Sequence, residues 1–122
     1  MAARRTTTAL ALLILTGCAT AIAPPPRAAP DPGTLSALER FGRHPCTGRV
    51  AEVLAGLGVP GSAVTGVTYD ERRYLNRERP WGYDVWVQRA GEPGALVVSV
   101  DDICVPQQVY ARGGASLPGG RG

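Results

Sequence analysis

The chain has 122 residues, with 13 arginines, no lysine, 10 acidic residues and a single histidine. Its formal net charge of +3 includes Arg4 and Arg5 near the N-terminus, so the rest of the chain is nearly neutral. This balance excludes the clustered positive charge by which proteins bind nucleic acid, and the length suffices for one small domain but not for two.

The N-terminal segment has the pattern of an export signal. Arg4 and Arg5 precede a short apolar run at 9–15, and small residues follow that run. A transmembrane helix needs about 20 apolar residues, which is more than this run supplies. We therefore expect a signal peptide. An ordinary secretory cleavage after Ala21 or Ala23 is one alternative, since both positions end an A-x-A pattern.

The sequence Leu15-Thr16-Gly17-Cys18 resembles the lipobox of bacterial lipoproteins. The resemblance implies that signal peptidase removes residues 1–17 and that acyl chains, palmitate among them, are attached to the sulfur and the amine of Cys18. Two or more acyl chains anchor a protein stably in a bilayer. Because Ala19 rather than an aspartate follows the cysteine, the resemblance implies sorting to the periplasmic face of the outer membrane rather than to the inner membrane.

A proline-rich segment follows the expected lipid attachment site. Residues 19–33 contain five prolines and no apolar face. Such a composition favours an extended, solvated chain of about 3.1 Å per residue. We therefore expect residues 18–33 to form a lipidated tether that holds the domain clear of the lipid surface.

Two short helices are predicted, at 35–43 and at 48–57. Thr34 is expected to cap the first helix and Thr47 the second. The second helix has one continuous apolar face, formed by Val50, Val53, Leu54 and Leu57. Gly58 suits the left-handed position that follows a helix.

The rest of the domain has the patterns of β-strands. Apolar and polar residues alternate at 81–88 and 96–101, and the β-branched and aromatic residues of 64–69 indicate a further strand. A last strand is expected at 103–111, where Pro106 implies an edge or a bulge. Short turns between them indicate an antiparallel meander. We predict an α+β domain at 34–112, with one or two short helices packed on three to four strands. The glycine-rich residues 113–122 are expected to form a disordered tail.

Cys46 and Cys104 remain after lipidation of Cys18. An even pair in an exported chain is typical of a disulfide, because the bacterial periplasm is oxidising. One alternative is a metal site that adds His44, although this set offers at most three ligands without the paired spacing of zinc sites. Another alternative makes Cys46 a nucleophile with His44 as its base.

Two places could bind a partner. Residues 70–79 are dense in both signs of charge and include Arg72, Arg73 and Tyr74. A mixed-charge surface loop is the ordinary interpretation, and an interaction patch is the sharper one, since arginine and tyrosine are enriched at binding hot spots. Trp86 falls on the sheet face opposite Val85 and Val87. There it is either covered by a loop or helix, or serves as a binding anchor.

No motif for catalysis, cofactor binding or metal binding emerges. A single histidine gives no support to a Ser-His-Asp set, and no phosphate-binding loop, H-E-x-x-H or C-x-x-C sequence occurs. Asp101 and Asp102 are adjacent acids, but they suit a turn better than a catalytic cleft. We expect no enzymatic activity and no small-molecule substrate.

The order of lipobox, proline-rich tether, two helices and antiparallel strands resembles the small BamE/SmpA-like lipoproteins of the β-barrel assembly machinery. Residues 50–60 are similar to that family's helix, which ends in a Leu-Gly-x-Pro turn. The resemblance implies an envelope lipoprotein that binds another protein in outer-membrane assembly or integrity. One alternative is an inhibitor of a periplasmic hydrolase that uses Trp86 and residues 70–79 as a plug. A second is a redox or metal-binding protein that works through Cys46.

Overall fold

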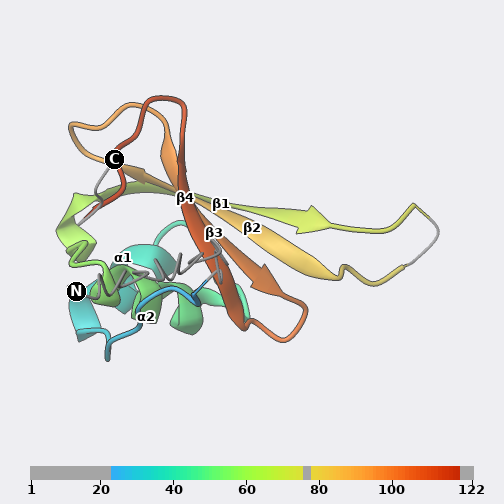
Figure 1. Cartoon of the computed structure of the whole chain (residues 1–122). Helices are drawn as coiled ribbons and strands as arrows, with labels where there is room; N and C mark the ends of the chain where they lie inside the picture. Colours follow the sequence, from blue (N-terminus) through green and yellow to red (C-terminus); the bar gives the residue numbers. More distant parts are fainter. Residues whose placement is uncertain (1–22, 76–77, 119–122) are drawn as a thin grey trace, which may run out of the picture.

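The computed structural model describes residues 23–75 and 78–118, so the expected signal peptide and Cys18 lie outside the described residues. In chain order, the elements are α1 (Pro32–Glu39), α2 (Thr47–Gly56), the short 3-10 helix η1 (Gly61–Ala63), β1 (Val64–Arg72), β2 (Gly82–Arg89), β3 (Ala95–Asp101) and β4 (Pro106–Arg112). Figure 1 shows the helices gathered on one side of the strands. The α+β class is confirmed.

The four strands form one antiparallel sheet in the order β1-β2-β3-β4, as the alternating pattern predicts. Each strand therefore pairs with its neighbours along the chain. A cross-strand row runs through Thr68, Trp86, Val97 and Tyr110 on one face. The adjacent row on the other face contains Val87 and Leu96, because side chains alternate along a strand.

A single buried cluster contains side chains from helices and strands. Fully buried strand residues in it are Val85, Val87, Leu96, Val98 and Val100. The helices contribute Leu38, Val50, Val53 and Leu54 to the same cluster. At about 25 cal/mol per Å² of apolar surface, burial of these side chains is the main favourable term in folding.

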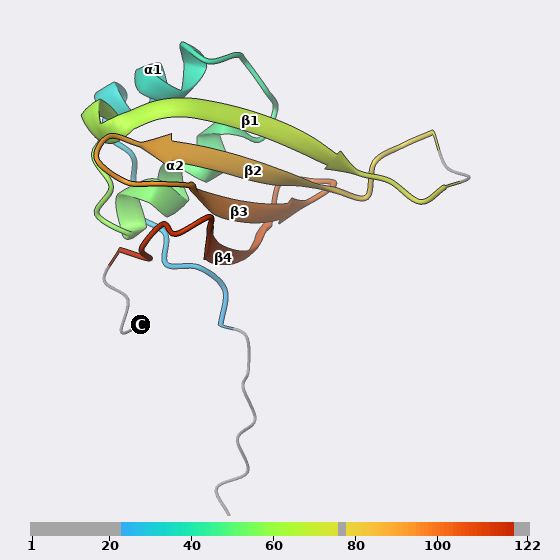
Figure 2. The same ribbon diagram turned by 90° about the horizontal axis from the view of Figure 1, so that it is seen from above.

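The helices do not cover the sheet in the way that we predicted. They lie against each other, and they come closest to the strands at β1 and β4. The β1–β2 hairpin runs out well beyond them in both views (Figures 1 and 2). The hairpin extends beyond the helices because β1 is longer than predicted. It continues past Tyr69 through Asp70, Glu71 and Arg72, and these three residues pair with β2.

Both helix starts also differ from the prediction, and Cys46 rather than Thr47 is the N-cap residue of α2. Asp31, not Thr34, caps α1, since its Oδ1 accepts hydrogen bonds from the Thr34 backbone N–H at 2.6 Å and the Thr34 hydroxyl at 2.9 Å. These bonds hold the pKa of Asp31 below its usual value. Pro32 then begins the helix, where its fixed φ and missing N–H are tolerated. Gly58 does have the predicted left-handed conformation, with φ 72°.

The first part of the glycine-rich tail is held against the domain. Ser116 donates from its hydroxyl to Glu92 at 2.6 Å and from its backbone N–H at 3.3 Å. Arg89 donates to the Ser116 carbonyl at 2.5 Å. The described tail therefore lies beside the β2–β3 turn, at the end of the sheet opposite the projecting hairpin.

Candidate interaction surface

One end of the sheet combines the projecting hairpin with the β3–β4 turn. We call it the hairpin end, meaning residues 72–75 and 78–82 together with 101–105. Seven large hydrophobic side chains are exposed among the described residues, and five of them belong here: Tyr74, Leu75, Trp81, Ile103 and Val105. Leu75 is fully exposed, and Ile103 is 73% exposed. This concentration of apolar surface makes the hairpin end the candidate interaction surface.

Arg72 fixes the base of the hairpin. Its guanidinium carbon lies 4.2 Å from the centre of the Trp81 ring, and one of its nitrogens donates to the Val100 carbonyl at 2.7 Å. Its Nε lies 3.6 Å from Asp84 Oδ1. Gly82 makes room for this crossing, because a Cβ there would lie 2.6 Å from the Val100 oxygen. The arginine is therefore used inside the protein and presents little of its charge to a partner.

Arg73 is also paired within the hairpin. It forms a hydrogen-bonded ion pair with Glu71 at 2.6 Å and donates to the Glu78 carbonyl. The hydrogen bond from Arg73 holds the pKa of the Glu71 carboxyl below its usual value. Both arginines predicted to bind a partner thus neutralise acids of the same sheet, which leaves apolar and aromatic groups as the distinctive surface.

Tyr74 and Trp81 form the aromatic part of the hairpin end. Their rings stack with centroids 5.7 Å apart. They line a shallow pocket of about 250 Å³ together with Arg79, Pro80 and Asp102. The pocket therefore lies between the hairpin and the β3–β4 turn, and both contribute to one surface.

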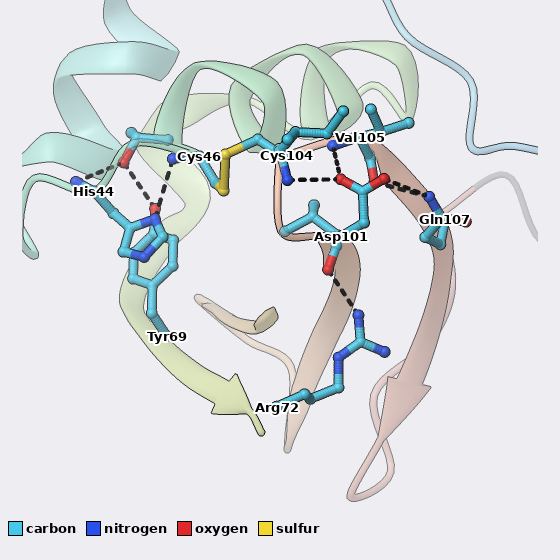
Figure 3. The surroundings of a disulfide bond; sticks show 11 residues. His44, Cys46, Tyr69, Arg72, Asp101, Cys104, Val105 and Gln107 are labelled. Carbon is cyan, nitrogen blue, oxygen red and sulfur yellow. Dashed lines mark hydrogen bonds between the residues drawn. A yellow bond between two sulfur atoms is a disulfide. The ribbon is translucent and has the colours of Figure 1, made fainter. Parts of the chain in front are cut away.

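The β3–β4 turn is held in one conformation by Asp101 (Figure 3). The Asp101 carboxylate accepts from the backbone N–H of Ile103 at 3.0 Å and of Val105 at 2.8 Å. Cys104 has a left-handed backbone, with φ 68°, and a disulfide joins it to Cys46. Ile103 and Val105 are thus displayed on a rigid turn. This supports the prediction that Asp101 serves a turn.

The predicted disulfide Cys46–Cys104 is confirmed, and it ties the start of α2 to the hairpin end. A sulfur bonded to another sulfur neither ligates a metal as a thiolate nor attacks a substrate. His44 makes a different contact, since its Nδ1 accepts the Cys46 backbone N–H at 3.1 Å. Its ring stacks on Tyr69 with centroids 4.2 Å apart and meets the edge of Tyr83 at 4.5 Å.

Trp86 lies apart from the hairpin end. It pairs with Thr68 and Val97 in the middle of the sheet, whereas Arg72 pairs with Gly82 near the strand ends. Its ring is half-buried, and within the described part of the chain its buried Nε1 has no hydrogen-bond partner. The structure therefore brings together Arg72, Arg73 and Tyr74 from the predicted set and leaves Trp86 elsewhere.

Trp81 is a surface residue that the sequence pattern missed. The strand predicted at 81–88 included it, but it precedes β2 and is 41% exposed. Pro80 was the available signal, because a proline cannot donate to a strand ladder and commonly precedes one. Trp81 instead closes the hairpin base, since its backbone N–H donates to the Arg72 carbonyl at 2.8 Å.

Comparison of the chain with protein-family models, curated proteins and solved structures gives no significant match. Within residues 23–75 and 78–118, no helix is long and apolar enough to cross a bilayer. The same residues contain no group of three or more histidine, cysteine or acidic side chains placed to hold a metal ion.

Proposed function

We propose that this chain is an exported lipoprotein, anchored through acyl chains on Cys18 at the periplasmic face of the bacterial outer membrane. The lipobox-like sequence Leu15-Thr16-Gly17-Cys18 supports the anchor. The disulfide supports export, because such bonds persist in oxidising compartments. Its domain acts without chemistry of its own, by binding another envelope protein through the hairpin end.

The observation that carries the binding function is the cluster of exposed apolar side chains on the hairpin end. Exposed apolar side chains that gather on one surface often mark a binding site. Tyrosine and tryptophan are also the side chains that most often dominate binding energy, since they bury a large area and lose little conformational entropy. The rigid base around Arg72 adds to this, because an ordered surface has less entropy to lose on association.

Two kinds of partner fit this surface. The resemblance to BamE/SmpA-like lipoproteins favours a subunit of outer-membrane assembly. The projection of the β1–β2 hairpin beyond the domain favours the alternative, a periplasmic hydrolase whose cleft the hairpin enters (Figure 2). Tyr74 and Arg73 then belong to the plug, while Trp86 lies too far back along β2 to enter with them.

Mild crosslinking followed by copurification tests the binding function. Leu75→Asp places a charge at the exposed tip and should lower partner capture at least tenfold. Leu117→Asp is the matched control, because Leu117 is also exposed but lies beyond β4. Barrel-assembly subunits among the captured proteins would favour the first partner and a lytic enzyme the second. Equal capture by the two variants would contradict the proposed surface.

Cell fractionation tests the anchor separately. Cys18→Ser removes the sulfur that carries the acyl chains, so the protein should move from the membrane fraction to the soluble periplasmic fraction. Mass spectrometry of the mature wild-type chain should show an acylated N-terminus at Cys18. Persistent membrane association of the variant, or an unacylated start beyond residue 18, would contradict the anchor.

A further inference from the structure

The proline-rich segment does not leave the domain as a free chain. The backbone N–H of Ala28 donates to the Glu52 carbonyl of α2 at 3.0 Å, and Pro25 is buried. Figure 1 shows this blue segment passing beside α2 before it enters α1. We call residues 23–31 the N-terminal strap.

The last residue of α2, Gly56, leaves room for this contact because it has no side chain. A Cβ on Gly56 would lie 2.6 Å from the Pro26 carbonyl carbon and 2.9 Å from the Arg27 nitrogen, closer than real Cβ contacts come. No other residue type fits at this position without moving the backbone of the strap. Gly48, in the same helix, shows the contrast, because a Cβ there meets no atom within 4 Å.

The far end of the strap is fixed as well. Asp31 caps α1, and α1 begins directly against η1, where a Cβ on Gly61 would lie 2.8 Å from the Gly33 oxygen. The strap is thus held at Gly56 on one side and at Asp31 on the other. Its path is therefore fixed from Pro26 to Asp31.

We propose that the N-terminal strap is a docked part of the domain and that it shortens the connection to the lipid. This rests on the proposed anchor at Cys18. From Cys18 to Pro25, the first buried residue of the strap, the chain spans seven residue steps, which reach at most roughly 25 Å when fully extended. A free polyproline-like tether from Cys18 to Asp31 would reach roughly 40 Å.

The shorter connection selects the kind of partner. With the strap docked, the α2 side of the domain stays close to the bilayer surface. The hairpin end then meets proteins whose contact region lies at that surface, either embedded in the outer membrane or bound to it. The docked strap thus shortens the distance that the hairpin end can reach from the bilayer, compared with a free tether.

Release of the membrane-bound protein by trypsin tests the docked strap. Cleavage between Arg27 and Ala28 frees the domain, and it requires the strap to leave α2. We expect slow release of the wild type, at least tenfold faster release of Gly56→Ala, and release of the control Gly48→Ala at the wild-type rate. N-terminal sequencing of the released fragment should show a start at Ala28.

A second variant shows whether faster release comes from the strap or from a change in α2. Pro25→Ser changes only the strap and should also accelerate release, while thermal unfolding of the domain stays cooperative. Wild-type release as fast as that of Gly56→Ala would overturn the proposal. Release of Gly56→Ala as slow as that of Gly48→Ala would do so too.

Hydrogen exchange separates failure of the strap from failure of the anchor. The Ala28 amide should exchange at least tenfold more slowly than an unprotected amide in the purified mature chain, whether or not it carries lipid, and Gly56→Ala should abolish this protection. Protection without membrane attachment would place the failure at Cys18. An unprotected Ala28 in the wild type would overturn the strap and leave the anchor untouched.

Discussion

His44, the single histidine of the chain, lies between Tyr69 and Tyr83 and beside the disulfide. Its Nδ1 accepts a backbone N–H, which requires an unprotonated nitrogen at that position. Burial lowers the pKa of His44, and the negative charge of Glu71 acts in the opposite direction. The residue is therefore a structural group whose neutral form the fold prefers.

The stability of the domain should fall as the pH drops below the ordinary histidine pKa of 6.5. His44 binds its proton less readily when folded than when unfolded, so its full contribution is present above pH 6.5 and is lost on acidification through the folded pKa. The slope cannot exceed about 1.4 kcal/mol per pH unit for one proton. Denaturant unfolding at pH 7, 6 and 5 measures it.

His44→Asn is the matched control for this pH dependence, because an amide oxygen can accept the Cys46 N–H but does not titrate here. The variant should show a flatter profile between pH 7 and 5. Asp31, Glu71 and Glu92 have lowered pKa values and lose their contributions only below about pH 4.5. An equal slope in wild type and variant would show that His44 is not the titrating group.

At the scale of elements, the hairpin end joins β1, β2 and the β3–β4 turn through one arginine. Arg72 crosses Gly82 to reach the Val100 carbonyl and covers the Trp81 ring. Its Asp84 partner also accepts a hydrogen bond from Ser99 at 2.6 Å. These contacts link three strands at the base of the projection, so the exposed tip rests on an ordered support.

Replacement of Arg72 should therefore cost more than replacement of its neighbour. Arg72→Gln loses a charged hydrogen bond and a cation–π contact, so the free energy of unfolding should fall by about 1–3 kcal/mol. Arg73→Gln breaks an exposed ion pair that water and salt screen, so it should cost clearly less than Arg72→Gln. Urea denaturation measures both. A loss with Arg73→Gln that matches or exceeds that with Arg72→Gln would contradict this division of roles.

The sheet could be predicted from the sequence because its buried row is a plain alternation, with Val85 and Val87 on β2 and regular valines on β3. The extension of β1 through Arg72 could not, because charged residues resemble a loop until a partner strand satisfies their backbone groups. The cap on α1 was misplaced since both Asp31 and Thr34 are good caps, and only Asp31 precedes the proline that starts the helix.

The candidate surface was predictable only in part. Arg72, Arg73 and Tyr74 were named from composition, but their pairing depends on β2 and β3 and is invisible along the chain. Ile103 was assigned to a strand, whereas it lies in the turn that Asp101 holds, with its side chain exposed. The docked strap was missed because it is held by a backbone hydrogen bond and by the space that Gly56 leaves. Neither produces an apolar pattern in the sequence.

At the scale of the molecule, the disulfide connects the two halves of the chain. It joins the N-cap of α2 to the β3–β4 turn across 58 positions in sequence. The covalent loop therefore encloses α2, β1, β2 and β3, whereas α1 and β4 lie outside it. A small domain with few helix–strand contacts gains most from such a link, because its buried core alone supplies limited stability.

Reduction of the disulfide should therefore lower stability sharply. A loop of this length restricts the unfolded chain by roughly 4 kcal/mol on the entropy treatment, and each kcal/mol shifts Tm by about 4–8 °C in a domain of this size. Reduction of the wild type keeps every atom of the core, whereas Cys46→Ser also buries a hydroxyl at a position without exposure. Calorimetry with and without reductant should thus show a fall of several degrees or more, and Cys46→Ser should fall at least as far. An unchanged Tm after verified reduction would mean that the disulfide adds nothing to the stability of the domain.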